Sequence, residues 1–153
     1  MLGKRNGPLL LTIVDRTSRL TKIAKLEKLS AELAHKETVR LLSKQKVKTI
    51  TNDNGPEFSW FRFTETDLKT VVYFNRPYCS WQRGTNENTN GLIRQYFPKG
   101  TDLALVTTDE VQRVEDLLNS RPRKCLGYKT PIEVHKALTL SLIHISEPTR
   151  PLH

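Results

Sequence analysis

Two apolar runs near the start of the chain predict a β-hairpin. Residues 9–14 form a continuous apolar run, which is typical of a buried strand, and residues 20–26 alternate in part between apolar and polar side chains. The polar residues 15–19 between the two runs supply a turn. Two further strands are expected at residues 47–51, which are rich in β-branched side chains, and at residues 71–74.

Apolar residues at helical spacing separate and follow these strands. Ser30 is placed to cap a helix that ends near Ser43. Shorter helices are expected at residues 57–66 and 86–96, and another one from Thr130, where a proline follows the cap. Strands and helices therefore alternate along the chain, as they do in an α/β domain.

The clearest helix of the second half starts at a capping box. Thr107 and Glu110 have the spacing in which each side chain bonds the other residue's backbone N–H. The apolar positions that follow, which we expect on one buried face, are Val111, Val114, Leu117 and Leu118.

The end of the chain does not continue this pattern. From about Leu138 the side chains alternate as in a strand, but a proline-containing stretch follows and offers no pairing partner. Residues 141–151 also resemble translated adaptor sequence. We therefore assign residues 1–136 to the domain and expect residues 137–153 to be a non-native tail. Recovery of the same reading frame from an independent clone would contradict that assignment.

Charge narrows the classes of partner. The formal net charge is +9 and the isoelectric point is near 9.8, which favours a polyanion such as nucleic acid. No secretory signal or membrane span is apparent, and Cys79 and Cys125 stand alone, so neither a zinc site nor a disulfide framework is indicated. We expect a cytoplasmic protein.

The first candidate for chemistry is Asp53, directly after the third expected strand. A carboxylate at a strand end is held by the sheet and faces an edge that water, metal or substrate can reach. Asn54 and Gly55 are expected to shape the turn that aims it. The alternative is an ordinary Asx-turn, because Asp-Asn-Gly is a favoured turn sequence.

The second candidate is Glu87, in the first turn of the expected helix 86–96. Asn90, Gly91 and Arg94 follow it at spacings of three, four and seven residues and share its face. Two carboxylates can converge on divalent cations, which prefer oxygen ligands, and Arg94 can meet a phosphate. The alternative for Glu87 is an acid favoured by the helix dipole.

The remaining polar residues divide into two groups. In the expected loop 75–85, Trp81, Gln82, Arg83 and Thr85 are placed to grip a DNA strand, although Trp81 is equally well read as a packed side chain. The residues that we interpret as ordinary surface groups are His35, His135, Lys99, Arg121, Arg123 and Lys124.

Four stretches carry a family resemblance. They read TITNDNGPEF at 49–58, RPYCSWQRGTNENTNG at 76–91, RQYFPKG at 94–100 and NSRPRKCLGYKTPIEV at 119–134. The sequence resembles the integrase catalytic core of bacterial insertion-sequence transposases, most closely the insertion-sequence-thirty family. The resemblance runs from about Gly3 to Lys136.

The resemblance implies a ribonuclease-H-like fold, with a mixed sheet flanked by helices and its first strand largely missing here. It implies an Asp-Asp-Glu triad that binds two Mg²⁺ (or Mn²⁺) ions, in which Asp53 matches the second aspartate and Glu87 the glutamate. The implied chemistry is hydrolysis of the strand at the element end, followed by attack of the freed 3′ hydroxyl on target DNA. The residues expected to bind DNA are Arg83, Asn90, Arg94 and Lys99.

The sequence departs from the family at the first aspartate. Asp15 follows a run that matches the family's second strand, so we do not take it as the third carboxylate. The missing aspartate belongs a few residues before Gly3-Lys4. We therefore expect that Met1 is not the true start of the family domain, that an N-terminal helix-turn-helix region is missing, and that catalysis is largely lost.

Two other functions stay open at this point. The first is a catalytically dead remnant that binds DNA or forms oligomers, and the second is another ribonuclease-H-like nuclease. The partners expected are DNA (transposon ends and target) and further copies of the chain, in association with the bacterial nucleoid. No membrane or small-molecule substrate is expected.

Overall fold

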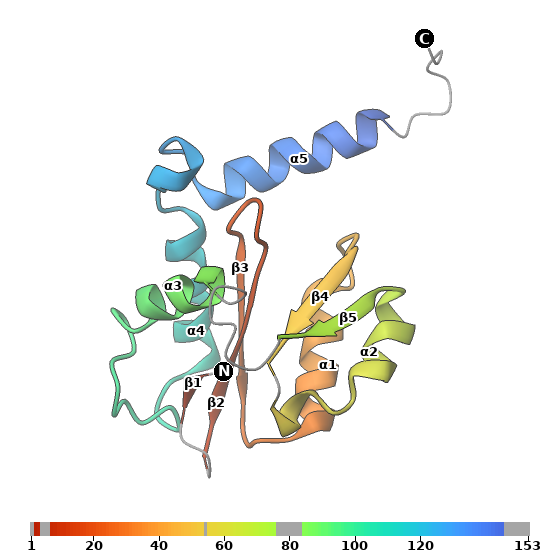
Figure 1. The fold of residues 1–153 in the computed structure, drawn as a ribbon. Helices are drawn as coiled ribbons and strands as arrows, with labels where there is room; N and C mark the ends of the chain where they lie inside the picture. The colour runs from red at the N-terminus through yellow and green to blue at the C-terminus, as the bar shows by residue number, and fades with distance from the viewer. Residues whose placement is uncertain (1, 4–6, 54, 76–83, 146–153) are drawn as a thin grey trace.

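The computed structural model describes residues 2–3, 7–53, 55–75 and 84–145 (Figure 1). Its strands are β1 Leu2–Gly3, β2 Leu9–Val14, β3 Thr21–Leu26, β4 Thr49–Asn52 and β5 Val71–Phe74. Its helices are α1 Ala31–Leu42, α2 Phe61–Leu68, α3 Gly84–Ile93, α4 Thr108–Asn119 and α5 Pro131–Ile145, with 3₁₀ turns at Pro56–Phe58 and Lys124–Leu126. The expected mixture of strands and helices is confirmed.

The strands form one antiparallel and one parallel group. β2 pairs with β1 on one side and with β3 on the other, in the order β1-β2-β3, and the hairpin register runs from Leu9 opposite Leu26 to Val14 opposite Thr21. β4 and β5 pair in parallel, with Asn52 opposite Phe74. Among the described residues, no ladder of hydrogen bonds joins the two groups.

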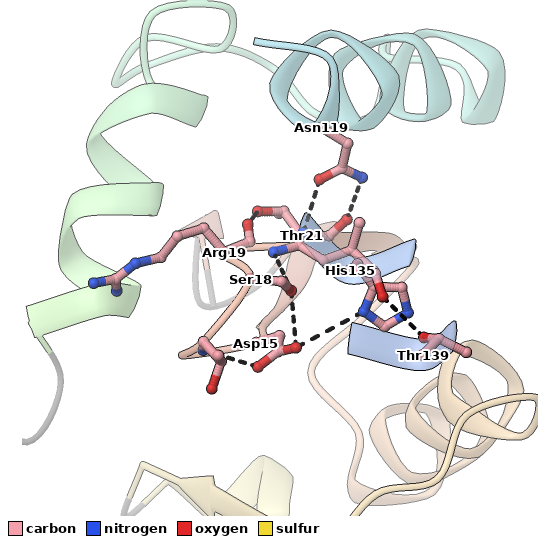
Figure 2. A network of polar contacts seen from close by, with 9 residues as sticks. Asp15, Ser18, Arg19, Thr21, Asn119, His135 and Thr139 are labelled. Atoms are coloured by element: carbon pink, nitrogen blue, oxygen red, sulfur yellow. Dashed lines mark hydrogen bonds and ion pairs between the residues drawn. The ribbon is translucent and has the colours of Figure 1, made fainter. Parts of the chain in front are cut away.

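The predicted hairpin turn is confirmed and depends on Asp15. Its backbone N–H donates to Leu20 O (2.9 Å), and its backbone oxygen accepts from Arg19 N (2.8 Å). Its carboxylate accepts from Thr17 N (3.0 Å) and from the hydroxyl of the fully buried Ser18 (2.8 Å). Figure 2 shows these contacts at the tip of the hairpin, where Asp15 acts as the turn residue of an Asx motif.

Both faces of β2 are buried, which explains its unbroken apolar run. Leu10 faces a core cluster shared with α3 and α4, whereas Leu9 and Leu11 face a second cluster shared with α1. In Figure 1, α3 and α4 lie on one side of the hairpin, and α1, α2 and the β4–β5 pair lie on the other. Each fully buried leucine contributes about 1.5–3 kcal/mol through removal of apolar surface from water.

Helix α4 bonds the outer edge of β3 through two side chains one turn apart. Asn119 accepts from Thr21 N (2.8 Å) and donates to Thr21 O (2.9 Å), and a Glu115 carboxylate oxygen accepts from Ile23 N (2.8 Å). Of the expected capping box, the structure shows the half in which Thr107 accepts from Glu110 N (3.1 Å). These side chains occupy the place of a neighbouring strand and satisfy a buried sheet edge.

This edge contact also sets which face of α4 is buried. Val111, Val114 and Leu118 are buried as expected, but Leu117 is 43% exposed, so its assignment to the buried face was wrong. The reason is that Glu115 and Asn119 must face β3, and this rotates Leu117 toward solvent.

His35 is not the surface residue that the sequence indicated. Its Nδ1 lies 2.9 Å from Thr64 Oγ1 and its Nε2 lies 3.1 Å from Asp67 Oδ2, while the rings of Trp60 and Phe63 pack beside it. The assignment failed because α2 covers the polar side of α1, a tertiary contact that helical spacing does not reveal.

The alternating pattern after Leu138 does not form a strand, since residues 131–145 form the single helix α5. A lone strand leaves its backbone groups without partners, whereas a helix satisfies them internally. The start at Thr130 is confirmed by its side chain, which accepts from Glu133 N (3.2 Å). The non-native origin of residues 137–153 stays a prediction. None of the described helices combines the length and apolar character needed to cross a bilayer.

We predict that Asn119→Ala lowers the free energy of unfolding by about 2 kcal/mol or more, because both backbone groups of Thr21 lose their partner while buried. Leu117→Ala is the matched control on the exposed face of the same helix and should change stability by only about 0.5 kcal/mol. Urea unfolding followed by circular dichroism measures both. Equal stability of the two variants would contradict the role of α4 at this edge.

Candidate functional site

Asp53 and Asn75 meet at one edge of the parallel pair. Asp53 follows the last residue of β4 and Asn75 follows the last residue of β5. The Asn75 backbone N–H donates to Asn52 O (3.0 Å), and its side-chain amide donates to Asp53 Oδ1 (3.3 Å). Asn75 is 8% exposed and Asp53 is half-buried, so a buried amide holds the carboxylate in place.

Sequence reasoning missed Asn75 and assigned it only to a loop. The available signal was its position directly after strand 71–74, the same position that Asp53 has after its own strand. Because parallel strands end at the same edge of a sheet, the two side chains were bound to be neighbours if the strands paired.

Neither backbone angle nor space makes glycine necessary in the turn after Asp53. Gly55 has an extended backbone (φ −98°, ψ 153°), so it does not need the left-handed freedom of glycine. A Cβ at this position would meet only the carboxylate of Glu57, which is the end of a flexible side chain and can move aside. Asn54, the other residue expected to shape the turn, lies outside the described residues.

Glu87 stands in the first turn of α3 and is exposed. Within the described part of the chain, its carboxylate makes no hydrogen bond or ion pair, and none links it to Asp53. The helix begins at Gly84, earlier than the sequence indicated, and Thr85 belongs to it rather than to the preceding loop. Asp53 is thus held by a hydrogen bond from Asn75, whereas the Glu87 carboxylate has no partner among the described residues.

The residues that share the face of Glu87 differ in what they contact. Asn90 is half-buried, and its side-chain oxygen accepts from the Thr12 hydroxyl of β2 (3.3 Å), which docks α3 on the hairpin. Gly91 is exposed, Arg94 is half-buried just beyond the helix, and Lys99 is exposed. Trp81, Gln82 and Arg83, the expected DNA-gripping residues, lie outside the described residues.

The interpretation of Arg123 as a surface group was wrong, because its side chain is buried. It is 8% exposed; its backbone N–H donates to Lys129 O (3.0 Å), and its guanidinium donates to Leu118 O at the end of α4 (3.4 Å). Burial lowers the pKa of Arg123, as do the positive charges of Arg121 and Arg19, whereas Cys125 raises it. Lys124 and Arg121 are exposed as expected.

Asp15 and His135 meet at the tip of the hairpin. Nδ1 of His135 lies 3.8 Å from Oδ2 of Asp15, which links α5 to the hairpin tip (Figure 2). His135 is partly covered rather than fully exposed, with 27% of its side chain accessible. Both carboxylate oxygens of Asp15 already accept hydrogen bonds in the turn, which agrees with its interpretation as a turn residue.

The donor chemistry fits a hard divalent cation only in part. The carboxylate oxygens of Asp53 and Glu87 are the ligand type that Mg²⁺ prefers. In the ranges that the structure describes, however, no three acidic, histidine or cysteine side chains gather closely enough to hold a metal ion. Two carboxylates therefore leave most of a coordination shell to water and to substrate phosphate oxygens.

Comparison with known proteins identifies relatives of one kind. The chain is 46% identical over 140 residues to the transposase for insertion sequence element IS4351 of Bacteroides fragilis, covering 90% of this chain and 43% of that protein. It is 47% identical over 128 residues to the transposase InsI for insertion sequence element IS30A of Escherichia coli strain K12, covering 80% of this chain and 33% of that protein. The chain spans less than half the length of these curated relatives, and no family model matches it.

Solved structures show the same fold at low sequence identity. The catalytic core domain of BIV integrase matches with a TM-score of 0.66 at 18% identity, over 88% of this chain and 90% of that domain. A chain of the simian T-cell lymphotropic virus intasome, solved in complex with PP2A regulatory subunit B56 gamma, matches with a TM-score of 0.69 at 20% identity, over 95% of this chain and 51% of that chain. The expected ribonuclease-H-like fold class is confirmed.

The contact between Asn75 and Asp53 generates a prediction. Asn75→Asp places a second carboxylate against Asp53, and the repulsion should lower the melting temperature in EDTA by about 4 °C or more. Millimolar Mg²⁺ should restore part of that loss, because two adjacent carboxylates bind a divalent cation better than one.

Asn75→Ala is the control, since it removes the amide without adding charge. Thermal unfolding of both variants with and without Mg²⁺ supplies the comparison. An Asn75→Asp variant that melts like the unmodified chain in EDTA would show that the two side chains are not neighbours.

Proposed function

We propose that this chain, a member of the IS30 family of insertion-sequence transposases, forms a catalytic core that cleaves and joins DNA strands during transposition. The observation that carries the proposal is its 46–47% identity to two transposases over 128–140 residues. The similarity of the fold to an integrase catalytic core also supports the proposal, because this structural match occurs at only 18% sequence identity. Divalent metal dependence follows for this class of enzyme in general.

Asp53 and Glu87 are the residues proposed to hold the metal, Mg²⁺ or Mn²⁺, as two ions in the complete site. Bound ions of this kind activate an attacking oxygen and stabilise the leaving oxygen in phosphoryl transfer. Asn75 contributes by orienting the Asp53 carboxylate, so that one ligand is fixed before DNA arrives. The exposed, uncommitted Glu87 carboxylate supplies the second ligand from α3.

The substrate proposed is DNA at the element end, followed by target DNA. In the first step water attacks the phosphodiester and the 3′ oxygen leaves as a hydroxyl; in the second step that hydroxyl attacks a target phosphodiester. Arg83, Asn90, Arg94 and Lys99 are proposed to contact DNA, and the amide of Asn90 retains two donors after its oxygen is used by Thr12. Further copies of the chain are the expected protein partners.

The number of carboxylates at the site limits the rate of strand cleavage expected of this chain alone. A triad needs a third acidic ligand, and within the described residues none joins Asp53 and Glu87. We therefore expect weak strand cleavage by this chain by itself. A DNA-binding remnant without catalysis is the competing outcome, and the following experiment separates the two.

We predict that Glu87→Gln lowers Mn²⁺- or Mg²⁺-dependent cleavage of a DNA duplex by about 100-fold or more relative to the unmodified chain, the scale expected for loss of a group that stabilises developing charge. Glu110→Gln is the matched control, because Glu110 also stands exposed in the first turn of a helix. Loss of a favourable helix-dipole contact affects both variants, whereas loss of a metal ligand affects only one.

A single-turnover assay with a labelled duplex that carries an element end gives the rates, and binding of the same duplex is measured alongside. Equal cleavage by the two variants, together with unchanged binding, would favour the remnant without catalysis.

A further inference from the structure

Arg19 occupies a backbone conformation that its side-chain type disfavours. Its φ is +62° at the end of the hairpin turn, in the left-handed region where glycine or asparagine is normally found. Residues held there against preference often have a functional reason. Figure 2 shows the Arg19 side chain directed away from Asp15 and toward α3, where its Nη1 donates to the Thr85 hydroxyl.

Arg121 approaches the other end of the same helix. It is exposed in the loop after α4, and its Nη1 donates to Gln95 Oε1 (3.1 Å), just beyond α3. Thr85 and Gln95 lie on the order of 15 Å apart at the rise of an α-helix. Two guanidinium groups thus flank α3, one near each end.

Arg123 adds a third positive charge, close enough to these two to be affected by both. Its buried guanidinium senses both Arg121 and Arg19, which lower its pKa in addition to the effect of burial, while Cys125 opposes them. In the part of the chain that the structure describes, none of the three arginines pairs with a carboxylate, and their side-chain partners are the neutral oxygens of Thr85, Gln95 and Leu118. Like charges held together without a counter-charge attract an anion.

We propose that Arg19 and Arg121, backed by the charge of Arg123, bind the phosphates of a DNA strand that runs beside α3, the helix that carries Glu87. We call these three residues the arginine row. A guanidinium has five N–H donors, so the single bonds to Thr85 and Gln95 leave Arg19 and Arg121 with donors for phosphate oxygens. The assignment rests on the proposed function, because it places DNA beside the helix that carries Glu87.

The bonds to α3 also have a purely structural interpretation, in which the arginines only fasten the helix. Substitution at the partner separates the two. Thr85→Val removes the acceptor of Arg19 but leaves its charge. A fastening role predicts a lower melting temperature in Thr85→Val, as in Arg19→Asn, and no change in DNA binding in either variant.

The test is the salt dependence of duplex DNA binding by the 153-residue chain, measured by fluorescence anisotropy without divalent metal. Each phosphate contact contributes about 0.9 to the slope of log K against log salt concentration. Arg19→Asn and Arg121→Gln should each reduce the slope by about 1, and the double variant by about 2. Asn tolerates the left-handed region, so the turn persists in Arg19→Asn.

Lys69→Asn is the matched control. Lys69 is an exposed cation with φ +51° at the end of α2, on the other side of the hairpin from α3 (Figure 1), so the substitution makes the same change of charge at the same kind of backbone position. It should leave the slope unchanged, as should Thr85→Val.

If the salt-dependence slopes of Arg19→Asn and Arg121→Gln equal that of Lys69→Asn, the proposal that the arginine row binds DNA is wrong. The proposed catalysis is judged separately, by the effect of Glu87→Gln on cleavage. A slope change without any Glu87 effect keeps the arginine row and refutes the catalytic proposal. If the unmodified chain binds no duplex even at low salt, both fall together.

Discussion

The backbone N–H and C=O groups at the outer edge of β3 are buried and need hydrogen-bond partners. Helix α4 supplies these partners with side chains in place of a neighbouring strand. Glu115 and Asn119 bond the backbone of Ile23 and Thr21 at 2.8–2.9 Å in the buried interior. Because bonds to a buried backbone tolerate little displacement, they fix both the position and the rotation of α4. The loop that follows α4 carries Arg121, so the placement of this arginine at the end of α3 depends on the same contact.

The two proposed metal ligands are supported in different ways. Asp53 is held at a strand end by the buried Asn75, whereas Glu87 projects from a helix that is docked on β2 through Asn90. One carboxylate is therefore held by a hydrogen bond, whereas the other makes none among the described residues. Such a division suits a site that completes its coordination only when substrate phosphate arrives.

Local features were predictable from the sequence, and tertiary ones were not. The hairpin follows from the apolar runs and Asp15, and the start of α1 follows from Ser30, whose side chain accepts from Leu33 N. The strand before Asp53 was also predictable, because strand and turn preferences act over a few residues. Leu117 and His35 were misassigned because the partner elements β3 and α2 determine their exposure.

The site shows the same division. The placement of Asp53 after a strand and of Glu87 within a helix was predictable from the sequence, but the position of Asn75 beside Asp53 required the knowledge that β4 and β5 pair in parallel. Arg123 was read as solvated because a charged residue in a basic loop usually is; its burial depends on the fold of residues 121–129 against α4. The alternating pattern after Leu138 did not decide the structure of this segment, which continues helix α5 because a helix satisfies its backbone groups without a partner.

The central claim is that Asp53 and Glu87 hold metal together. The most direct measurement is the titration of the ¹⁵N-labelled chain with Mn²⁺, because a paramagnetic ion broadens the amide signals nearest to it. The account predicts that the amides around Asp53, Asn75 and Glu87 broaden first and at the same Mn²⁺ concentration. Broadening that begins at the acidic first turn of α4, around Asp109 and Glu110, and leaves Asp53 and Glu87 sharp would contradict it.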